Sequence, residues 1–265
     1  MSKNNTTVII PVHKLDDSTA KLFSNAVKSV EAQKTLPLEL MIVVPKDSEV
    51  SKFMETFDFN TIKNIVTIVE NDGATDFCSQ FNFGVEKAKG EWVSLLEFDD
   101  EYANTWFKNV EIYQEAYPNV ELFLPIIIDV DETNSFIRFI NEAVWANSFS
   151  DEIGILDNNA LLAYQNFSID GMVIKKSLFA DFGGFKPSIK LAFIYEFLLR
   201  MTFKDVRTMV IPKFSYKHVA QREGSLFHEC SQTMNQIEVN WWLSTAKKEY
   251  YFPKDRNITY KPQLT

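Results

Sequence analysis

Short apolar runs alternate with amphipathic stretches along the first half of the chain. Length and β-branched content predict buried strands at residues 7–12, 40–44, 64–69, 92–96 and 120–128. Apolar residues on one helical face predict helices at 18–32, 50–57, 76–88 and 104–117. Buried strands that alternate with helices indicate an α/β fold, with a mainly parallel sheet covered by helices on both faces.

The second half has a less regular pattern. Residues 131–165 are polar with scattered aromatic residues, and we predict no strand there and a helix over 136–147. Beyond it we expect a strand at 172–174, helices from 176 and over 187–202, a strand at 208–216, and a long helix from 223 or 224 to 248. Because there is no internal repeat and no obvious linker, a single domain over residues 1–265 fits best.

A parallel sheet also predicts where a ligand binds. Right-handed crossovers place the carboxyl ends of the strands along one edge, and ligands in such folds bind at that edge. Glu97, Asp99 and Asp100 directly follow the predicted strand 92–96. Their mutual repulsion needs compensation, and a hard cation is the usual one. The alternative is a solvated loop in which Asp99 or Asp100 caps the next helix, and the cluster alone does not decide between them.

Other candidate positions are weaker in isolation. Glu196 has apolar neighbours that would raise its proton affinity, which suits a general base. A surface pair with Arg200 four residues later is the more ordinary interpretation. His218 and Arg222 follow a predicted strand, where an imidazole can bind a metal and a guanidinium can clamp a diphosphate. A lone histidine is nevertheless more often structural.

Composition narrows the function classes. The net charge of −9 argues against a broad electrostatic grip on nucleic acid. Cys78 and Cys230 form no closely spaced pair, so a structural zinc site is unsupported. The sequence lacks the motifs of P-loop kinases, Rossmann dehydrogenases, α/β-hydrolases and zincins. With no signal peptide and no apolar stretch long enough to cross a bilayer, we expect a soluble, cytoplasmic protein.

The order of the motifs is more informative than any one of them. The first strand ends in Ile-Ile-Pro-Val at 9–12, and Ser-Val-Glu-Ala-Gln occupies 29–33. Asn82-x-Gly84, Ala-Lys-Gly at 88–90 and Leu-Glu-Phe-Asp-Asp at 96–100 follow, and then the segment 171–185 with its Gly-Gly-Phe. Over roughly residues 6–225 this series resembles glycosyltransferase family 2, which has the GT-A fold.

The resemblance implies a metal-dependent, inverting transfer of a sugar from a nucleotide-sugar, most readily a UDP-sugar, to an acceptor hydroxyl. Asp99, with help from His218, would bind Mn²⁺ or Mg²⁺, and Glu196 would be the general base. The positions expected to contact the nucleotide-sugar are Pro11, Val12, His13, Asp47, Asn82, Glu97, Phe98 and Arg222. The donor half would span 6–128, the acceptor and catalytic half 129–225, and a helical extension 226–265.

Departures from the family pattern keep alternatives open. Glu97 replaces the first aspartate of the D-x-D motif, and Glu196 falls where the family shows Glu-Asp. Pro-Lys-Asp-Ser at 45–48 stands where the family has Asp-Asp-Gly-Ser, so Asp47 would take the nucleobase role only after a shift of register. A degenerate, non-catalytic nucleotide-sugar-binding protein is one alternative. An enzyme that glycosylates a hydroxylated base in nucleic acid is a second and less favoured one.

The C-terminal aromatic residues leave a further question open. Trp241, Trp242, Tyr250, Tyr251 and Phe252 lie in or near the last predicted helix. Aromatics at helical spacing are more often core or contacts in a homo-oligomer than a membrane-docking surface. The sequence names neither the sugar nor the acceptor.

Overall fold

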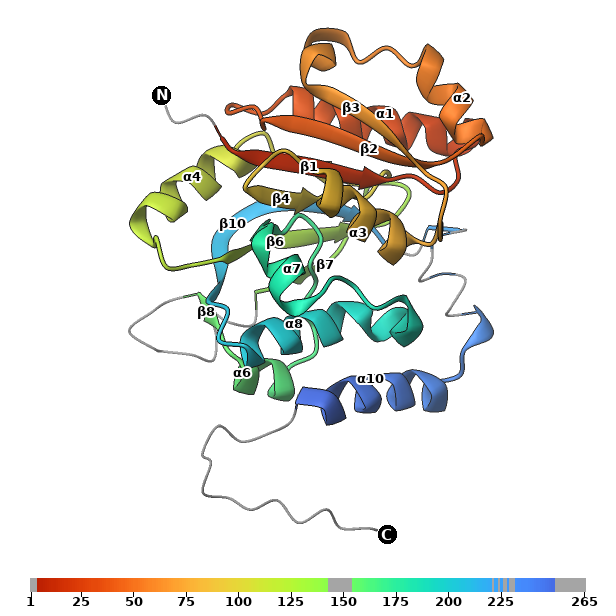
Figure 1. Cartoon of the computed structure of the whole chain (residues 1–265). Helices are drawn as coiled ribbons and strands as arrows, with labels where there is room; N and C mark the ends of the chain where they lie inside the picture. The colour runs from red at the N-terminus through yellow and green to blue at the C-terminus, as the bar shows by residue number, and fades with distance from the viewer. Residues whose placement is uncertain are drawn as a thin grey trace, which may run out of the picture.

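The computed structural model describes residues 4–142, 154–220, 222–223, 225, 228 and 232–250 (Figure 1). Within these residues a ten-stranded sheet has the order β3-β2-β1-β4-β9-β6-β10-β5, with β7 paired to β6 and β8 paired to β10. β1, β2, β3 and β4 are mutually parallel, and β6 is parallel to β10. β9 is antiparallel to both β4 and β6, so the two parallel groups run in the same direction. The predicted mainly parallel α/β sheet is confirmed.

The first half supplies four parallel strands and the elements between them. The strands are β1 (Thr6–Pro11), β2 (Glu39–Pro45), β3 (Val66–Asn71) and β4 (Trp92–Leu95). The helices are α1 (Asp17–Glu31), α2 (Glu49–Thr56), the 3₁₀-helix η1 (Asn60–Ile65), α3 (Phe77–Lys87) and α4 (Trp106–Ala116). All of these elements lie within a few residues of their predicted positions, apart from η1, which was not predicted.

The rest of the chain, from residue 101 and apart from α4, completes the sheet and covers one face of it. Its strands are β5 (Glu101–Tyr102), β6 (Leu122–Val130), β7 (Phe136–Ile140), β8 (Ile155–Leu156), β9 (Val173–Lys175) and β10 (Thr208–Val219). Its helices are α6 (Asn158–Ala163), α7 (Ser177–Phe182), the 3₁₀-helix η2 (Pro187–Ala192), α8 (Phe193–Phe203) and α10 (Gln236–Tyr250).

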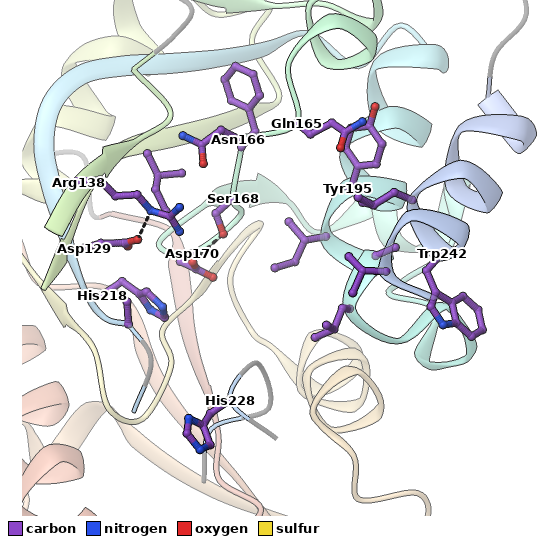
Figure 2. Close-up of a pocket in the computed structure, with 18 of the residues that line it drawn as sticks. Asp129, Arg138, Gln165, Asn166, Ser168, Asp170, Tyr195, His218, His228 and Trp242 are labelled. Carbon is purple, nitrogen blue, oxygen red and sulfur yellow. Dashed lines mark hydrogen bonds and ion pairs between the residues drawn. The ribbon is translucent and has the colours of Figure 1, made fainter. Parts of the chain in front are cut away.

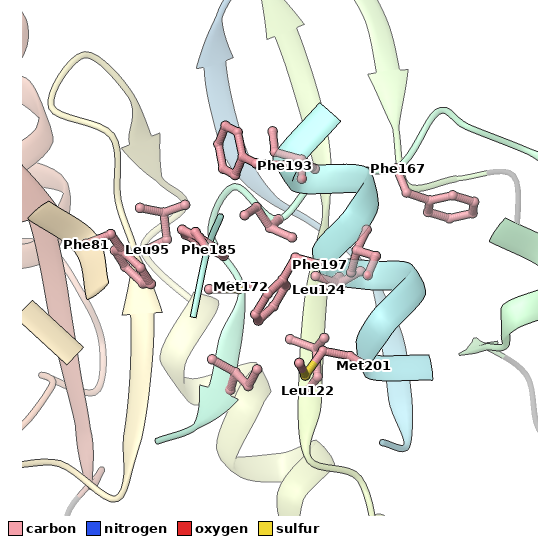
Figure 3. Packing of buried hydrophobic residues seen from close by; sticks show 14 of the residues in the cluster. Phe81, Leu95, Leu122, Leu124, Phe167, Met172, Phe185, Phe193, Phe197 and Met201 are labelled. Atoms are coloured by element: carbon pink, nitrogen blue, oxygen red, sulfur yellow. The ribbon is translucent and has the colours of Figure 1, made fainter. Parts of the chain in front are cut away.

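Alternation along the strands produces two apolar cores, one on each face of the sheet. Ile9 of β1 belongs to the core beneath α3 and α8, whereas its neighbours Val8 and Ile10 belong to the core beneath α1 and α4. Figure 3 shows the first of these cores, in which Phe185 and Phe197 pack edge to face at 4.9 Å between ring centroids. Helices on both faces therefore follow from central strands, such as β1 and β2, whose side chains are buried on both sides of the sheet.

Predictions about the second half were wrong in two regions, and the segment 131–165, where no strand was expected, contains two, β7 and β8. Residues 136–140 form strand β7 instead of a helix, because the Asp131 carboxylate accepts hydrogen bonds from the backbone of Thr133 and Ser135 and turns the chain back onto β6. The rest of that predicted helix lies outside the described residues. The last helix begins at Gln236, since Ser225, Met234 and Asn235 are not helical.

Two expectations concerned membranes and the C-terminal aromatics. Of the helices in the described part of the chain, none has the length and apolar character to cross a bilayer. Trp241 is 56% exposed on α10, while Trp242 beside it is half-buried. Tyr251 and Phe252 lie outside the described residues.

Gly84 allows α3 to lie directly on the sheet. A Cβ atom at this position would come within 2.7 Å of Ile9 Cγ2 and 2.9 Å of Val43 Cγ2, on two strands that end at the predicted ligand edge. We expect Gly84→Ala to lower the free energy of unfolding by about 1–3 kcal/mol, because extra volume in a packed core forces strain. Urea unfolding measures this change. Glu86→Ala, an exposed position on the same helix, is the control, and equal stability of both variants would contradict the proposed close packing.

Candidate functional site

The loop that follows β4 meets the end of β10. The Asp99 carboxylate accepts a hydrogen bond from Arg222 Nε at 2.6 Å. Asp100 Oδ2 lies 3.0 Å from His218 Nδ1, and its Oδ1 accepts the backbone N–H of Val219 at 2.9 Å. Both carboxylates are buried. The acidic loop is therefore compensated by groups at and just beyond the carboxyl end of β10, so the predicted ligand edge is where the two halves of the sheet meet.

Burial and charge shift the pKa values of this loop. Burial raises the pKa of Glu97 well above its usual range, and the negative charges of Asp170 and Asp100 raise it further. Burial also raises the pKa of Asp100, to about 6, although His218 opposes the shift. Burial acts to lower the pKa of His218, but the charge of Asp100 and its hydrogen bond raise it well above the ordinary value. The carboxylate of Asp100 therefore favours the protonated imidazole and holds its Nδ1 side.

The expected metal site is not assembled in this arrangement. Among the described residues, no group of three or more His, Cys, Asp or Glu side chains is placed to hold a metal ion. The proposed ligands Asp99 and His218 have separate partners, Arg222 and Asp100. An ion at these two side chains would therefore have to bind beside Arg222 and Asp100 or displace them.

A cavity of about 520 Å³ opens beside this loop, and we call it the Asp99 cavity. Phe98, in the wall of this cavity, contacts two other lining residues. Its ring packs edge to face against the His13 ring, with centroids 6.2 Å apart, and the ring centroid lies 5.3 Å from the Arg222 guanidinium carbon. The structure brings six of the predicted positions to this cavity, namely Pro11, His13, Glu97, Phe98, Asp99 and Arg222. Sequence reasoning missed other lining residues, which come from the start of α3 and from η2 and α8: Asp76, Phe77, Lys190 and Phe193.

Three predicted nucleotide-sugar positions line neither this cavity nor the one described below. Val12 is fully buried in the apolar core. Asp47 is exposed in the turn after β2, with a φ of 53°. The Asn82 side chain bonds both the N–H and the C=O of Phe185, each at 2.8 Å, and so joins α3 to the segment before η2. Their positions support structural or solvent-facing roles.

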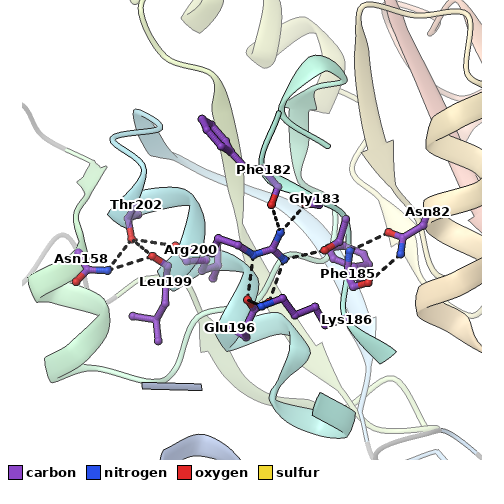
Figure 4. Close-up of polar contacts among 12 residues, drawn as sticks. Asn82, Asn158, Phe182, Gly183, Phe185, Lys186, Glu196, Leu199, Arg200 and Thr202 are labelled. Atoms are coloured by element: carbon purple, nitrogen blue, oxygen red, sulfur yellow. Dashed lines mark hydrogen bonds and ion pairs between the residues drawn. The ribbon is translucent and has the colours of Figure 1, made fainter. Parts of the chain in front are cut away.

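Glu196 is placed differently from the prediction (Figure 4). Its carboxylate is fully buried and accepts hydrogen bonds from Arg200 Nε at 2.9 Å and Nη2 at 3.0 Å, and Lys186 Nζ lies 2.9 Å away. Arg200 in turn donates to the backbone carbonyls of Phe182, Gly183 and Gly184. Glu196 lines neither cavity. This geometry favours a structural role over the expected general base, because the carboxylate ties α8 to the segment before η2.

A second cavity, of about 770 Å³, lies on the other side of Glu97, and we call it the Asp170 cavity. Glu97 lines both cavities, so the two spaces meet at this residue. His218 faces the Asp170 cavity as well, together with the acidic residues Asp129 and Asp170 (Figure 2). The sequence analysis did not single out these two aspartates. The available signal was the Asp-Gly pair at 170–171, directly before the predicted strand 172–174.

Comparisons with known proteins point to one class. No family model matches the chain. Among curated proteins, an uncharacterized glycosyltransferase of Haemophilus influenzae is 24% identical over 136 residues, which cover 51% of this chain and 44% of that protein. The match thus spans less than half the length of this relative.

Solved structures of Staphylococcus aureus TarS, residues 1–349, are similar over most of the chain. The complex with UDP has a TM-score of 0.62 at 15% identity and covers 93% of this chain and 72% of that one. The complex with UDP-GlcNAc has a TM-score of 0.64 at 15% identity, with coverages of 92% and 73%. This chain therefore has the GT-A-like α/β fold seen in TarS.

Proposed function

We propose that this chain is a glycosyltransferase that moves a sugar from a UDP-sugar to an acceptor hydroxyl. The observation that carries the proposal is the Asp99 cavity, which lies at the carboxyl ends of β1 and β4 and gathers Phe98, Asp99 and Arg222. Ligands of open α/β sheets bind at this edge. Support also comes from the shared fold, since the TarS structures contain UDP and UDP-GlcNAc.

Arg222 is the proposed partner of the donor diphosphate. Its Nε binds Asp99 and its Nη1 donates to the Glu223 carbonyl at 3.0 Å, so the guanidinium is held in one orientation at the cavity wall. Guanidinium groups present several N–H donors in a plane, and these match phosphate oxygens. A second cation, Lys190, lines the same cavity.

The reaction we propose is a single displacement with inversion at the anomeric carbon. The donor occupies the Asp99 cavity, and the acceptor enters from the Asp170 cavity, which meets it at Glu97. An acceptor hydroxyl that attacks from the side opposite the diphosphate inverts the anomeric configuration. Nuclear magnetic resonance of the product identifies that configuration, and a retained configuration would contradict the single displacement.

We expect Arg222→Met to weaken UDP binding about 10–100-fold, because a hydrogen bond to a charged group contributes about 1.5–3 kcal/mol. Isothermal titration calorimetry measures the affinity, and circular dichroism checks that the variant is folded. Lys213→Met, which removes an exposed cation in β10, is the matched control. Unchanged UDP affinity in Arg222→Met would count against this assignment of the donor site.

Dependence on Mn²⁺ or Mg²⁺ stays a prediction from the family resemblance. Because Arg222 Nε binds one oxygen of Asp99, an ion would have to bind the carboxylate beside the guanidinium or displace it. If the ion belongs to the site, UDP affinity is expected to be at least tenfold higher in MnCl₂ than in EDTA, and calorimetry makes this comparison directly. Equal affinities in the two buffers would contradict metal dependence.

Glu196→Gln is expected to destabilise the fold by about 3–5 kcal/mol, because it leaves the buried Arg200 without its charged partner. Urea unfolding measures this loss, with the exposed Glu55→Gln as control. UDP affinity of the folded variant should change little, since Glu196 lines neither cavity. A variant with wild-type stability and abolished sugar transfer would instead restore Glu196 as the general base.

Nucleotide-sugar binding without catalysis is a second candidate function. It is favoured by one observation, that the carboxylate expected to act as general base is held away from both cavities. Binding of UDP-GlcNAc with neither hydrolysis nor transfer would decide for it. The structure gives no support to a nucleic-acid acceptor. In the Asp170 cavity the acidic residues Glu97, Asp129 and Asp170 would repel its phosphates.

A further inference from the structure

Two buried carboxylates in the Asp170 cavity each keep one oxygen without a hydrogen-bond partner among the described residues. Asp170 Oδ2 accepts the Ser168 hydroxyl at 2.6 Å, and its Oδ1 has no partner. Asp129 Oδ2 accepts from Arg138 Nε at 2.8 Å, and its Oδ1 also has none. The two aspartates are 5% and 0% exposed, respectively. Unmade bonds to buried carboxylates are costly, so a ligand with O–H donors would satisfy both.

The backbone holds Asp170 beside the acidic loop. Gly171 has a φ of +73°, and its N–H donates to the Leu95 carbonyl at the end of β4, at 3.1 Å. A Cβ atom at Gly171 would come within 2.5 Å of the Tyr216 ring, whose hydroxyl accepts the N–H of Glu97. Only glycine permits this approach. Asp170 is thus placed next to Glu97, which, like Leu191 and Met234, lines both cavities.

A set of hydrogen bonds from Asn141 fixes the residues before Asp170. The fully buried Asn141 donates to the carbonyls of Pro125 and Ser168, at 2.9 and 3.1 Å, and accepts the N–H of Ser168 at 2.9 Å. Ser168 then donates its hydroxyl to Asp170. Because these bonds join β6 and the end of β7 to the loop, the carboxylate is pre-oriented before any ligand binds.

Apolar side chains also line the cavity, among them Phe167, Leu191, Ile194 and Leu243. Ile194, in the first turn of α8, lines the cavity, whereas Glu196 two residues later does not. A space lined by both hydrogen-bond acceptors and apolar side chains matches a saccharide, which has hydroxyl groups at its edge and C–H groups on its ring face.

Three carboxylates line this cavity, and one of them has the geometry of a base. Asp129 is paired with the cationic Arg138. Glu97 directs its backbone N–H to Tyr216 and lies between the cavities. Asp170 is held at Oδ2 by a neutral hydroxyl donor, and its other oxygen, Oδ1, is buried without a hydrogen-bond partner among the described residues in a side chain that lines the cavity.

We infer that the Asp170 cavity binds a saccharide acceptor and that Asp170 is the catalytic base for its attacking hydroxyl, an inference that rests on the proposed function. In the step, Asp170 Oδ1 takes the hydroxyl proton. The acceptor oxygen forms a bond to the anomeric carbon of the donor as the bond from that carbon to the diphosphate oxygen breaks, and its electron pair leaves with UDP. Asp129 accepts a second hydroxyl of the acceptor and so orients the ring.

The catalytic part is tested with UDP-GlcNAc, by the rate of UDP release and by calorimetric affinity. Asp170→Asn keeps the shape of the side chain and removes the base. We expect UDP release to water or to an acceptor to fall about 10²–10⁴-fold, the usual contribution of a general base, with donor affinity within twofold of wild type. Ser168→Ala, which removes only the positioning hydroxyl, should cost less, and Glu55→Gln should cost nothing.

Undiminished UDP release by Asp170→Asn would overturn the catalytic role, as would a wild-type protein that binds UDP-GlcNAc and a saccharide without releasing UDP. Failure of wild type to bind either UDP or UDP-GlcNAc would instead overturn the proposed function. The two failures are therefore distinguishable.

The binding part is tested without turnover. Saturation-transfer nuclear magnetic resonance, in EDTA and with UDP present, measures binding of the methyl glycosides of glucose, galactose and N-acetylglucosamine, with cyclohexanol as a ring that has one hydroxyl. We expect at least one glycoside to bind, cyclohexanol to bind more weakly, and Asp129→Asn to reduce glycoside affinity at least tenfold. Binding of none of the glycosides, or equal binding by Asp129→Asn, would overturn the saccharide assignment.

Discussion

The structure of the site depends on charge compensation across the sheet. Asp99 and Asp100 are buried at the end of β4, where unpaired carboxylates would be strongly unfavourable. The chain meets this constraint with Arg222, His218 and a backbone N–H, all at or just after the end of β10. The same pairing positions the walls of both cavities, because the loop that carries Asp99 also carries Glu97 and Phe98.

The sheet can place these groups together because of how its two parallel sections are joined. β9 is inserted antiparallel between β4 and β6, and it lets β6 and β10 run in the same direction as β1 to β4. All the main carboxyl ends therefore lie at one edge, and Asp129, His218 and Glu97 meet there although they come from three strands or the loops after them. Gly171, just before β9, makes the close turn that adds Asp170 to the group.

Local pattern was sufficient to predict most of the first half of the fold. Continuous apolar runs defined β1 to β4, and the acidic residues after β4 lie at the edge of the sheet where the Asp99 cavity opens. The strand β7 was missed because its apolar residues are exposed aromatics such as Phe136, 58% exposed, whose pairing partner is set by the turn at Asp131.

The roles of single carboxylates were harder to predict than the edge at which they gather. Glu196 has suitable neighbours for a raised proton affinity, yet its own helix supplies Arg200 to neutralise it. In the sequence, Asp170 is marked only by the turn signal Asp-Gly. Its placement depends on Asn141, Ser168 and Tyr216, and no regular sequence spacing connects these residues to it. Residue type and spacing therefore locate a site, whereas ion pairing and backbone contacts decide what each member can do.

The distance in sequence between the acidic loop and its partners has a consequence for folding. The bonds from Asp99 and Asp100 to β10 and Arg222 span 118 to 123 residues. Contacts of such long range form late, because loop closure must precede them. During synthesis, β1 to β4 leave the ribosome well before Arg222, so the loop must stay in contact with water until β10 docks. The acidic loop and the groups that compensate it therefore come together only after most of the chain has been made.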